Sequence, residues 1–311
     1  MVKSIVTLTM NPAVDQSSKT DFVTDERKLK CSNEQYDPGG GGINVSRAIN
    51  ILGGHSKAFY PAGGCSGDLL ERLLDRERLE HSRISIEGRT RINIHLLETS
   101  TNRQYRLNMP GPNISEGEWR DCLKVIKEFT PAPDYIVASG SLPHGVPDDF
   151  YARLAHLSKK LNSKFILDSS GKPLQKALEE GVFLIKPNLN EFSHLINEKI
   201  KNEEQIIEKA KEIIHQKKCE VIVNSTGAAG TIVVTKDEAT HIYAPLVPIN
   251  SRIGAGDCMV AGITLKLANS VALMYAIRYG VAAGTAAVIT PGTELCRKKD
   301  VERLYKKLKE F

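Results

Sequence analysis

The sequence predicts an α/β protein with three layers, α/β/α, around a mostly parallel sheet, together with a small β-sheet lid. Short apolar, β-rich runs alternate along the chain with segments whose apolar residues recur at helical spacing, which is typical of such layers. Two stretches without helical period, 16–36 and 88–109, indicate the lid. We expect one domain over 1–311, with its α/β core in 1–15, 37–87 and 110–311.

The core strands are predicted at short apolar runs, which lie at 4–9, 135–138, 165–167, 183–185 and 221–224. The segment after residue 202 shows the helical pattern. Its first turn carries Glu203 and Glu204, its end carries Lys217 and Lys218, and isoleucines recur on one face, so both ends match the helix dipole. Ligands of such sheets bind beyond the carboxyl ends of the strands, where we therefore expect the site.

The lid is predicted from alternating polar and apolar residues in 91–97 and 104–109. The polar residues 98–103 between them are expected to form a hairpin turn. An isolated small sheet is marginally stable in water, so its apolar face needs cover. We expect a second copy of the chain to supply that cover, which predicts a homodimer through the lid.

Composition excludes several classes of protein. The chain has 311 residues, of which 41% are hydrophobic, enough to bury a core rather than stay disordered. The net charge of +5 is too small and too dispersed for a nucleic-acid surface, but it suits a pocket for a small anion. No signal peptide or run of 18 apolar residues occurs, and the six cysteines lack metal-site spacing. We expect a cytoplasmic protein with reduced thiols, no zinc and no membrane partner.

The first motif is four consecutive glycines at 39–42, directly before a predicted helix that ends at Gly53 and Gly54. A turn without side chains at a helix N-terminus lets the backbone approach a ligand closely. Asn44 could then direct its amide at sugar hydroxyls. The alternatives are a flexible linker and, for Asn44, an ordinary capping residue.

The second motif is Gly254-Ala255-Gly256-Asp257, followed by an apolar helix. The glycines bend the chain so that the first N–H groups of the helix, at its positive dipole end, form a site for negative charge. Asp257 lies where a general base would contact a substrate hydroxyl. The alternative is that Asp257 is the N-cap of the helix.

The third motif joins Lys186, Asn188 and Glu191, directly after a predicted strand. The i, i+3 spacing of Asn188 and Glu191 places a carboxylate and an amide on one helix face, which suits Mg²⁺ or its waters. A capping pair is the better-supported alternative. Residues 224–230 are typical of a glycine-bearing hairpin turn, and Asp15 and Asp168 each merely follow a strand.

Walker A, GxGxxG and HExxH sequences are absent, which removes the usual support for P-loop, dinucleotide-binding and zincin sites. Taken together and in their order, the motifs resemble those of ribokinase-like (PfkB) carbohydrate kinases over essentially the whole chain. The matching segments are 11–15, 28–31, 38–54, 104–106, 109–111, 139–143, 186–191, 226–230, 254–257 and 280–284. The resemblance implies a ribokinase-like fold and an ATP-dependent phosphotransferase with an alcohol acceptor, using Mg²⁺ and forming a homodimer through its lid.

The resemblance also implies roles for individual residues. Asp257 is the implied base, and the implied anion hole is Gly254, Ala255 and Gly256. The implied contacts to sugar hydroxyls are Asp15, Gly40, Gly41 and Asn44, and those to the substrate's phosphate are Lys28, Arg91 and Ser141. The implied ATP and Mg²⁺ residues are Lys186, Asn188 and Glu191, and the nucleotide site is Ser225, Thr226, Gly227, Gly230, Ile249 and Thr285. The positions that match a monovalent-cation (K⁺) site in relatives are Ser251, Ile253, Ala287, Thr290 and Gly292.

Two residues depart from the family pattern. Arg252 stands where relatives usually carry a small residue, and Glu294 replaces a commonly basic residue in the C-terminal loop. Both lie near the implied cation site, so either could change a dependence on K⁺. Neither touches the implied base.

The acceptor is inferred from basic residues placed on the predicted lid strands, namely Lys28, Lys30, Arg91 and Arg106. Among the acceptors that the resemblance implies, these residues favour a sugar phosphate over an unphosphorylated sugar or nucleoside, because a ligand phosphate needs cationic partners. We therefore expect fructose 6-phosphate, converted to the 1,6-bisphosphate. Fructose 1-phosphate and tagatose 6-phosphate are the alternative acceptors, and a solvated basic surface is the alternative role of the charges. A different class, a catalytically silent regulator that binds sugar phosphate and ATP, also remains open. The kinase hypothesis requires Asp257 and residues 39–42 to converge on one cleft.

Overall fold

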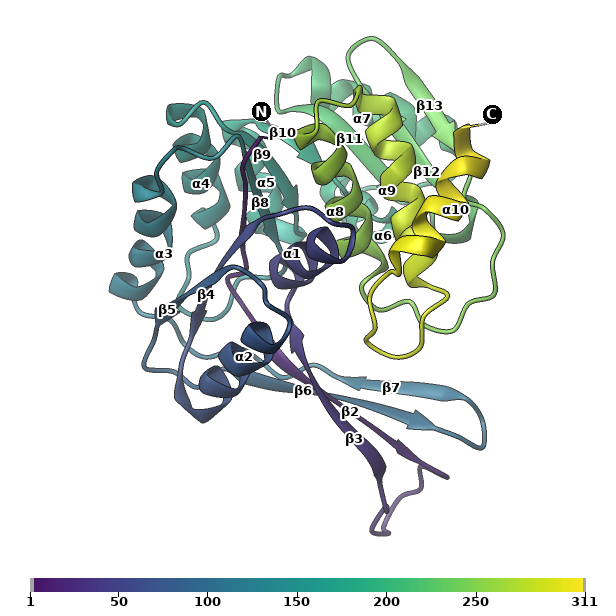
Figure 1. Cartoon of the computed structure of the whole chain (residues 1–311). Helices are drawn as coiled ribbons and strands as arrows, with labels where there is room; N and C mark the ends of the chain where they lie inside the picture. The colour runs from purple at the N-terminus through teal and green to yellow at the C-terminus, as the bar shows by residue number, and fades with distance from the viewer. Residues whose placement is uncertain (1–2, 310–311) are drawn as a thin grey trace.

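The computed structural model describes residues 3–309, and the larger of its two sheets is the centre of the molecule (Figure 1). In this part of the chain the sheet has nine strands in the order β13-β12-β11-β10-β9-β8-β1-β4-β5. Their bounds are β1 Ile5–Leu8, β4 Lys57–Ala62, β5 His81–Ser85, β8 Tyr135–Ser139, β9 Lys164–Asp168, β10 Val182–Ile185, β11 Cys219–Ser225, β12 Thr231–Val234 and β13 Ala239–Ile242. The five apolar runs predicted as core strands are confirmed as neighbouring parallel strands, and β12 and β13 add an antiparallel edge.

Helices cover both faces of this sheet, which confirms the three layers. One layer contains α1 Gly41–Ile51, α8 Ala255–Ala268, α9 Leu273–Ala287 and α10 Lys298–Lys309. The other contains α3 Glu116–Glu128, α4 Phe150–Lys160, α5 Gly171–Glu180, α6 Leu189–Ile196 and α7 Glu203–His215. Side chains alternate along β8, since Tyr135 and Val137 join the first core while Ile136 and Ala138 join the second.

The start of α8 is held in place by tight packing against α9. A Cβ added to Gly280 would lie only 2.4 Å from Ile263 Cγ1, so the two helices approach too closely for any side chain there. Helix α8 is apolar on nearly all sides and almost entirely buried, as expected of a core helix. Its N-terminal turn is thereby fixed in one place.

The second sheet has the order β3-β2-β6-β7 and projects from the core in Figure 1. Its strands are β2 Ala13–Thr20, β3 Ser32–Gly39, β6 Arg91–Glu98 and β7 Arg103–Leu107, and α2 Gly64–Arg76 packs against it. The predicted hairpin is confirmed as the antiparallel pair β6–β7. The prediction that Lys28 and Lys30 lie on strands is wrong, because both stand in the exposed connection between β2 and β3.

Within residues 3–309, none of the helices combines the length and the hydropathy needed to span a bilayer. All six cysteines are unpaired; Cys31 and Cys65 are exposed, and the other four are buried.

Candidate active site

Polar side chains from five elements meet beyond the carboxyl ends of the central strands. Ser139 ends β8, Asp168 ends β9 and Lys186 follows β10. The amide of Asn44, on α1, donates to Asp257 Oδ2 on α8 at 3.0 Å, and the Ser139 hydroxyl donates to Asp257 Oδ1 at 3.3 Å. Gly41 approaches the same Ser139 hydroxyl, so the two glycine-bearing motifs, about 200 residues apart, meet at one polar cluster.

The tetraglycine is part of the packed structure rather than a flexible linker. Helix α1 begins at Gly41, inside the tetraglycine and not after it. A Cβ on Gly41 would lie 2.1 Å from Ser139 Oγ, and one on Gly42 would lie 2.7 Å from the main-chain oxygen of Leu8. Gly40, the N-cap residue, has a φ of 110°, a conformation that other residues rarely adopt. Close backbone approach explains why side chains are missing at these positions.

The N-terminus of α8 is not capped by a side chain. Gly254 is its N-cap residue in the left-handed conformation, with φ 70°, and no side chain caps the helix. The N–H groups of Ala255 and Gly256 thus belong to a first turn without helical partners, at the positive end of the dipole. Asp257 is the third residue of the helix and hydrogen-bonds elsewhere, so its interpretation as the N-cap is wrong.

The electrostatic environment of Asp257 suits a proton acceptor. Burial raises its pKa to about 6, and the negative charge of Asp168 adds to the increase. The hydrogen bond from Asn44, the charge of Lys186 and the hydrogen bond from Ser139 oppose it. A carboxylate with a pKa near neutrality can be ionised at physiological pH and still take up a proton during a reaction.

Asp168, for which the sequence analysis predicts nothing beyond a position after a strand, belongs to the same cluster. The ammonium of Lys186 is 6% exposed and lies 3.3 Å from Asp168 Oδ1. Burial lowers the pKa of Lys186, but the carboxylates of Asp168, Glu191 and Asp257 outweigh it, so the pKa is raised and the side chain is charged. Asp168 could have been found from its position at the end of a strand whose neighbours also end at polar site residues. This signal becomes visible only once the strand order is known.

Asn188 and Glu191 form the capping pair at the start of α6. The amide oxygen Asn188 Oδ1 accepts from the Glu191 N–H, and Glu191 Oε2 accepts from the Asn188 N–H, both at 2.9 Å. Burial raises the pKa of Glu191, and Asp168 raises it further. Two carboxylates that destabilise each other's charge are also a suitable pair of hard oxygen ligands for a cation.

On the second sheet, Asp15 is buried and paired. Its Oδ1 accepts from Asn93 Nδ2 at 2.8 Å and lies 3.6 Å from His95 Nε2, while a Cβ on Gly39 would lie 2.4 Å from its Oδ2. The sequence analysis missed Asn93 and His95. The sequence does contain a signal for these two residues, because alternation along the predicted strand places Asn93 and His95 on the same face as Arg91.

The three residues expected to bind the substrate's phosphate, Lys28, Arg91 and Ser141, differ in their contacts and exposure. The Arg91 guanidinium donates to the carbonyl oxygens of Asn11 at 2.8 Å, Met109 at 3.1 Å and Pro12 at 3.4 Å, which ties the sheet to the core. Ser141 is exposed, and its hydroxyl accepts from Asn11 Nδ2 at 3.3 Å. Lys28 lies in the exposed connection between β2 and β3, which Figure 1 shows at the end of the second sheet that points away from the core.

A cavity of about 460 Å³ lies beside the start of α8 and matches the predicted nucleotide site. It is lined by Ser225, Thr226, Gly227, Gly230, Ile249 and Thr285, together with Gly256 and Arg252. Lys186 and Asn188 do not line this cavity. Its walls are mostly apolar, as expected where the flat face of a base is bound.

The predicted cation positions come together at one loop crossing. The Ser251 hydroxyl donates to the Gly292 carbonyl oxygen at 2.7 Å and accepts from the Ile253 N–H at 3.2 Å. The Thr290 hydroxyl donates to the Ala287 carbonyl oxygen at 2.7 Å. All the oxygens here are neutral carbonyl and hydroxyl groups.

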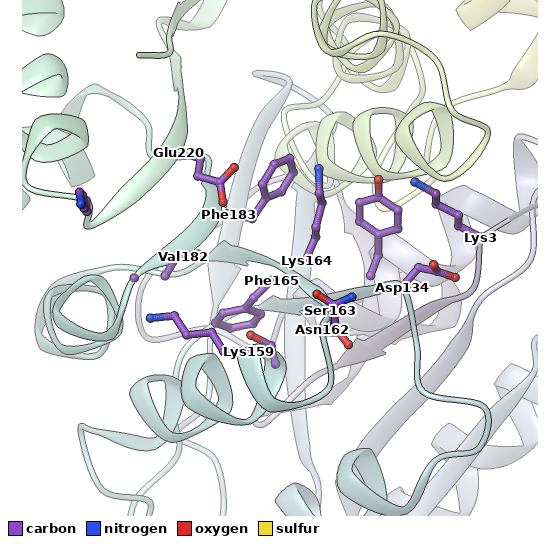
Figure 2. A pocket seen from close by; sticks show the side chains of 14 residues that line it. Lys3, Asp134, Lys159, Asn162, Ser163, Lys164, Phe165, Val182, Phe183 and Glu220 are labelled. Atoms are coloured by element: carbon purple, nitrogen blue, oxygen red, sulfur yellow. The ribbon is translucent and has the colours of Figure 1, made fainter.

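A separate cavity of about 560 Å³ lies at the amino ends of β8, β9 and β10 (Figure 2). Figure 2 shows the ammonium groups of Lys159 and Lys164 pointing in different directions, so they do not converge on one anion. None of the predicted site residues lines it.

Comparison with known proteins shows which family the chain belongs to. A family model described as pfkB family carbohydrate kinase matches residues 5–300. The ATP-dependent 6-phosphofructokinase isozyme 2 of Mycobacterium tuberculosis is 40% identical over 97% of this chain and 88% of the relative. The enzyme of the same name from Escherichia coli is 38% identical over 97% of each chain, and a 1-phosphofructokinase of Bacillus subtilis is 32% identical over 98% of each.

Among solved structures, phosphofructokinase-2 from Escherichia coli in complex with potassium matches with a TM-score of 0.95 and 37% identity, over 99% of both chains. A tetrameric inhibited form of that protein matches with a TM-score of 0.94 over 99% of both chains.

Proposed function

The chain belongs to the pfkB family of carbohydrate kinases, and we propose that it transfers the γ-phosphoryl group of ATP to fructose 6-phosphate, yielding fructose 1,6-bisphosphate. The observation that carries this proposal is the Asp257 carboxylate, held by Asn44 and Ser139 beside the open start of α8. An ionisable base and a site for negative charge then stand next to each other, as phosphoryl transfer requires.

In the proposed reaction, Asp257 takes the proton from the acceptor hydroxyl. The acceptor oxygen forms its bond to the γ-phosphorus while the bond to the bridging oxygen breaks, and that electron pair stays on ADP. The N–H groups at Ala255 and Gly256 bind the transferring phosphoryl oxygens, where backbone donors at a helix start are already oriented. Asn44 and Ser139 hold the carboxylate in place for this step.

The residues present fit Mg²⁺ bound together with ATP. Glu191 and Asp168 would supply the carboxylates, and Lys186 interacts with the charges of both and of Asp257. In residues 3–309 no group of three or more His, Cys, Asp or Glu side chains forms a complete metal site, so waters and phosphate oxygens must supply the other ligands. When bound, Mg²⁺ neutralises part of the phosphate charge.

The loop crossing at Ser251 and Gly292 fits a monovalent cation such as K⁺, because its oxygens are neutral and close together. Of the two departures from the family, Glu294 pairs with Arg297 at 2.5 Å on the exposed side, which leaves its charge directed at solvent. Arg252 lines the nucleotide cavity instead.

The preference for an acceptor that already carries a phosphate rests on the basic residues of the second sheet. Arg91 is largely engaged with carbonyl oxygens, whereas Lys28, Lys30 and Arg106 are exposed. Lys28 and Lys30 would reach a bound phosphate by movement of the sheet or from a partner subunit.

An ADP-release assay on a panel of acceptors tests the proposed function. We expect the highest kcat/KM with fructose 6-phosphate, lower values with fructose 1-phosphate and tagatose 6-phosphate, and little activity with fructose. The 1-phosphofructokinase relative makes fructose 1-phosphate the second candidate, and a higher kcat/KM with it would replace our assignment. Binding of sugar phosphate without ADP release from any acceptor would indicate the silent regulator.

Oligomeric state is a further prediction. The second sheet and its connections expose large apolar side chains, namely Phe22, Leu29, Tyr36, Leu107 and Met109. Covering them stabilises a marginal sheet, so we expect light scattering to give at least twice the chain mass of 34.3 kDa. A Leu107→Lys variant should shift the protein toward monomer, whereas Leu246→Lys, at an exposed site outside this sheet, should not. A monomeric parent protein at assay concentration contradicts the prediction.

A further inference from the structure

Arg252 lines the cavity that contains the residues of the predicted nucleotide site. It stands two residues before Gly254, the N-cap of α8, and lines the same cavity as Gly256, Ser225 and Thr285. Among residues 3–309 no other charged side chain lines this cavity. Among these residues, Arg252 is therefore the lining side chain whose charge can attract an anion into the cavity.

The guanidinium of Arg252 has no protein partner. The side chain is exposed, and within the described part of the chain it makes no hydrogen bond or ion pair. Other arginines are engaged, for example Arg47 with Glu77 and Arg83 with Asp68. An arginine that has five N–H donors directed at no acceptor remains available for a ligand.

The position of Arg252 is electrostatically unfavourable without an anion. The start of α8 carries the positive end of the helix dipole, which repels a guanidinium beside it. The charged side chains that stabilise the start of a helix are acidic, so the dipole of α8 does not itself hold the guanidinium at this position. A phosphate group between the guanidinium and the N–H groups of the first turn would reverse that interaction.

We propose that Arg252 is a catalytic residue that binds the terminal phosphates of the donor nucleotide. The inference rests on the proposed kinase function. During transfer the bond between the γ-phosphorus and the bridging oxygen breaks, and the electron pair remains on the β-phosphate of ADP. The guanidinium stabilises that growing charge, and its planar fork can contact two oxygens at once, which a lysine cannot do equally well.

Arg252→Gln tests the inference by binding and by kinetics, with Arg252→Lys as the conservative variant. Calorimetry should show ADP binding weakened about tenfold or more in Arg252→Gln, with adenosine binding unchanged, because adenosine has no phosphate. With saturating fructose 6-phosphate, kcat should fall roughly 10²-fold, the usual effect of losing one donor to a transition-state charge, and Arg252→Lys should recover part of it. Arg72→Gln, an equal charge change at an exposed site on α2, should match the parent protein in every measurement.

Arg252→Gln with parental ADP affinity, or with kcat within twofold of the parent, overturns the inference and indicates a solvated surface arginine. The calorimetry also separates this inference from the kinase assignment. If no acceptor supports ADP release but Arg252→Gln still loses ADP affinity selectively, the proposed function fails while the phosphate contact of Arg252 stands.

Discussion

Replacing Asp257 by asparagine is expected to lower kcat by about 10²–10⁴-fold while both substrates still bind. The amide has nearly the size of the carboxylate and can still accept a hydrogen bond from Asn44 or Ser139, but it cannot take up a proton from the acceptor hydroxyl. Steady-state kinetics with each substrate varied in turn should show KM values within a few-fold of the parent. A variant within about tenfold of the parental kcat would refute Asp257 as the base.

The pH profile supplies an independent check on the same residue. Because the pKa of Asp257 is raised to about 6, the base becomes protonated and inactive as the pH falls below that value. We expect kcat/KM of the parent protein to fall about tenfold per pH unit on this acidic limb, and the limb to be missing in Asp257→Asn. Asp121→Asn, a matched change at an exposed site on α3, should keep both the rate and the limb.

The sequence predicts the elements that build the candidate active site better than it predicts the contacts within that site. The apolar runs became the central strands because continuous burial on both faces leaves little choice of residue type. The start of α1 was placed too late, because glycine is a poor helix former and tertiary contact overrides that preference. Gly41 is helical because no side chain fits beside Ser139.

What the sequence could not supply is the long-range pairing of strands. Asp168 resembles any polar residue after a strand until β9 is known to lie between β8 and β10, where Asp168 meets Lys186. Lys28 and Lys30 alternate with apolar residues as strand residues do, but β2 ends at Thr20 and β3 begins at Ser32. A short alternating pattern is weak evidence for a strand when charged residues face solvent on both sides of the chain.

Replacing Lys186 by methionine is expected to affect both stability and catalysis. The buried ammonium interacts with the negative charges of Asp168, Glu191 and Asp257, and its loss leaves them without that compensation. Breaking a buried ion pair from one side typically costs about 3–5 kcal/mol, so chemical denaturation at neutral pH should show a decrease of that order in the free energy of unfolding. A change below about 1 kcal/mol would mean that water screens these charges effectively.

The sign of the accompanying pKa change distinguishes this electrostatic account from general damage to the site. Lys186 lowers the pKa of Asp257 and Asp168 raises it. The acidic limb of kcat/KM should therefore move to higher pH in Lys186→Met and to lower pH in Asp168→Asn, even though both variants lose activity. Shifts in the same direction would contradict the account, because a cation and an anion beside one carboxylate must act on its proton affinity with opposite signs.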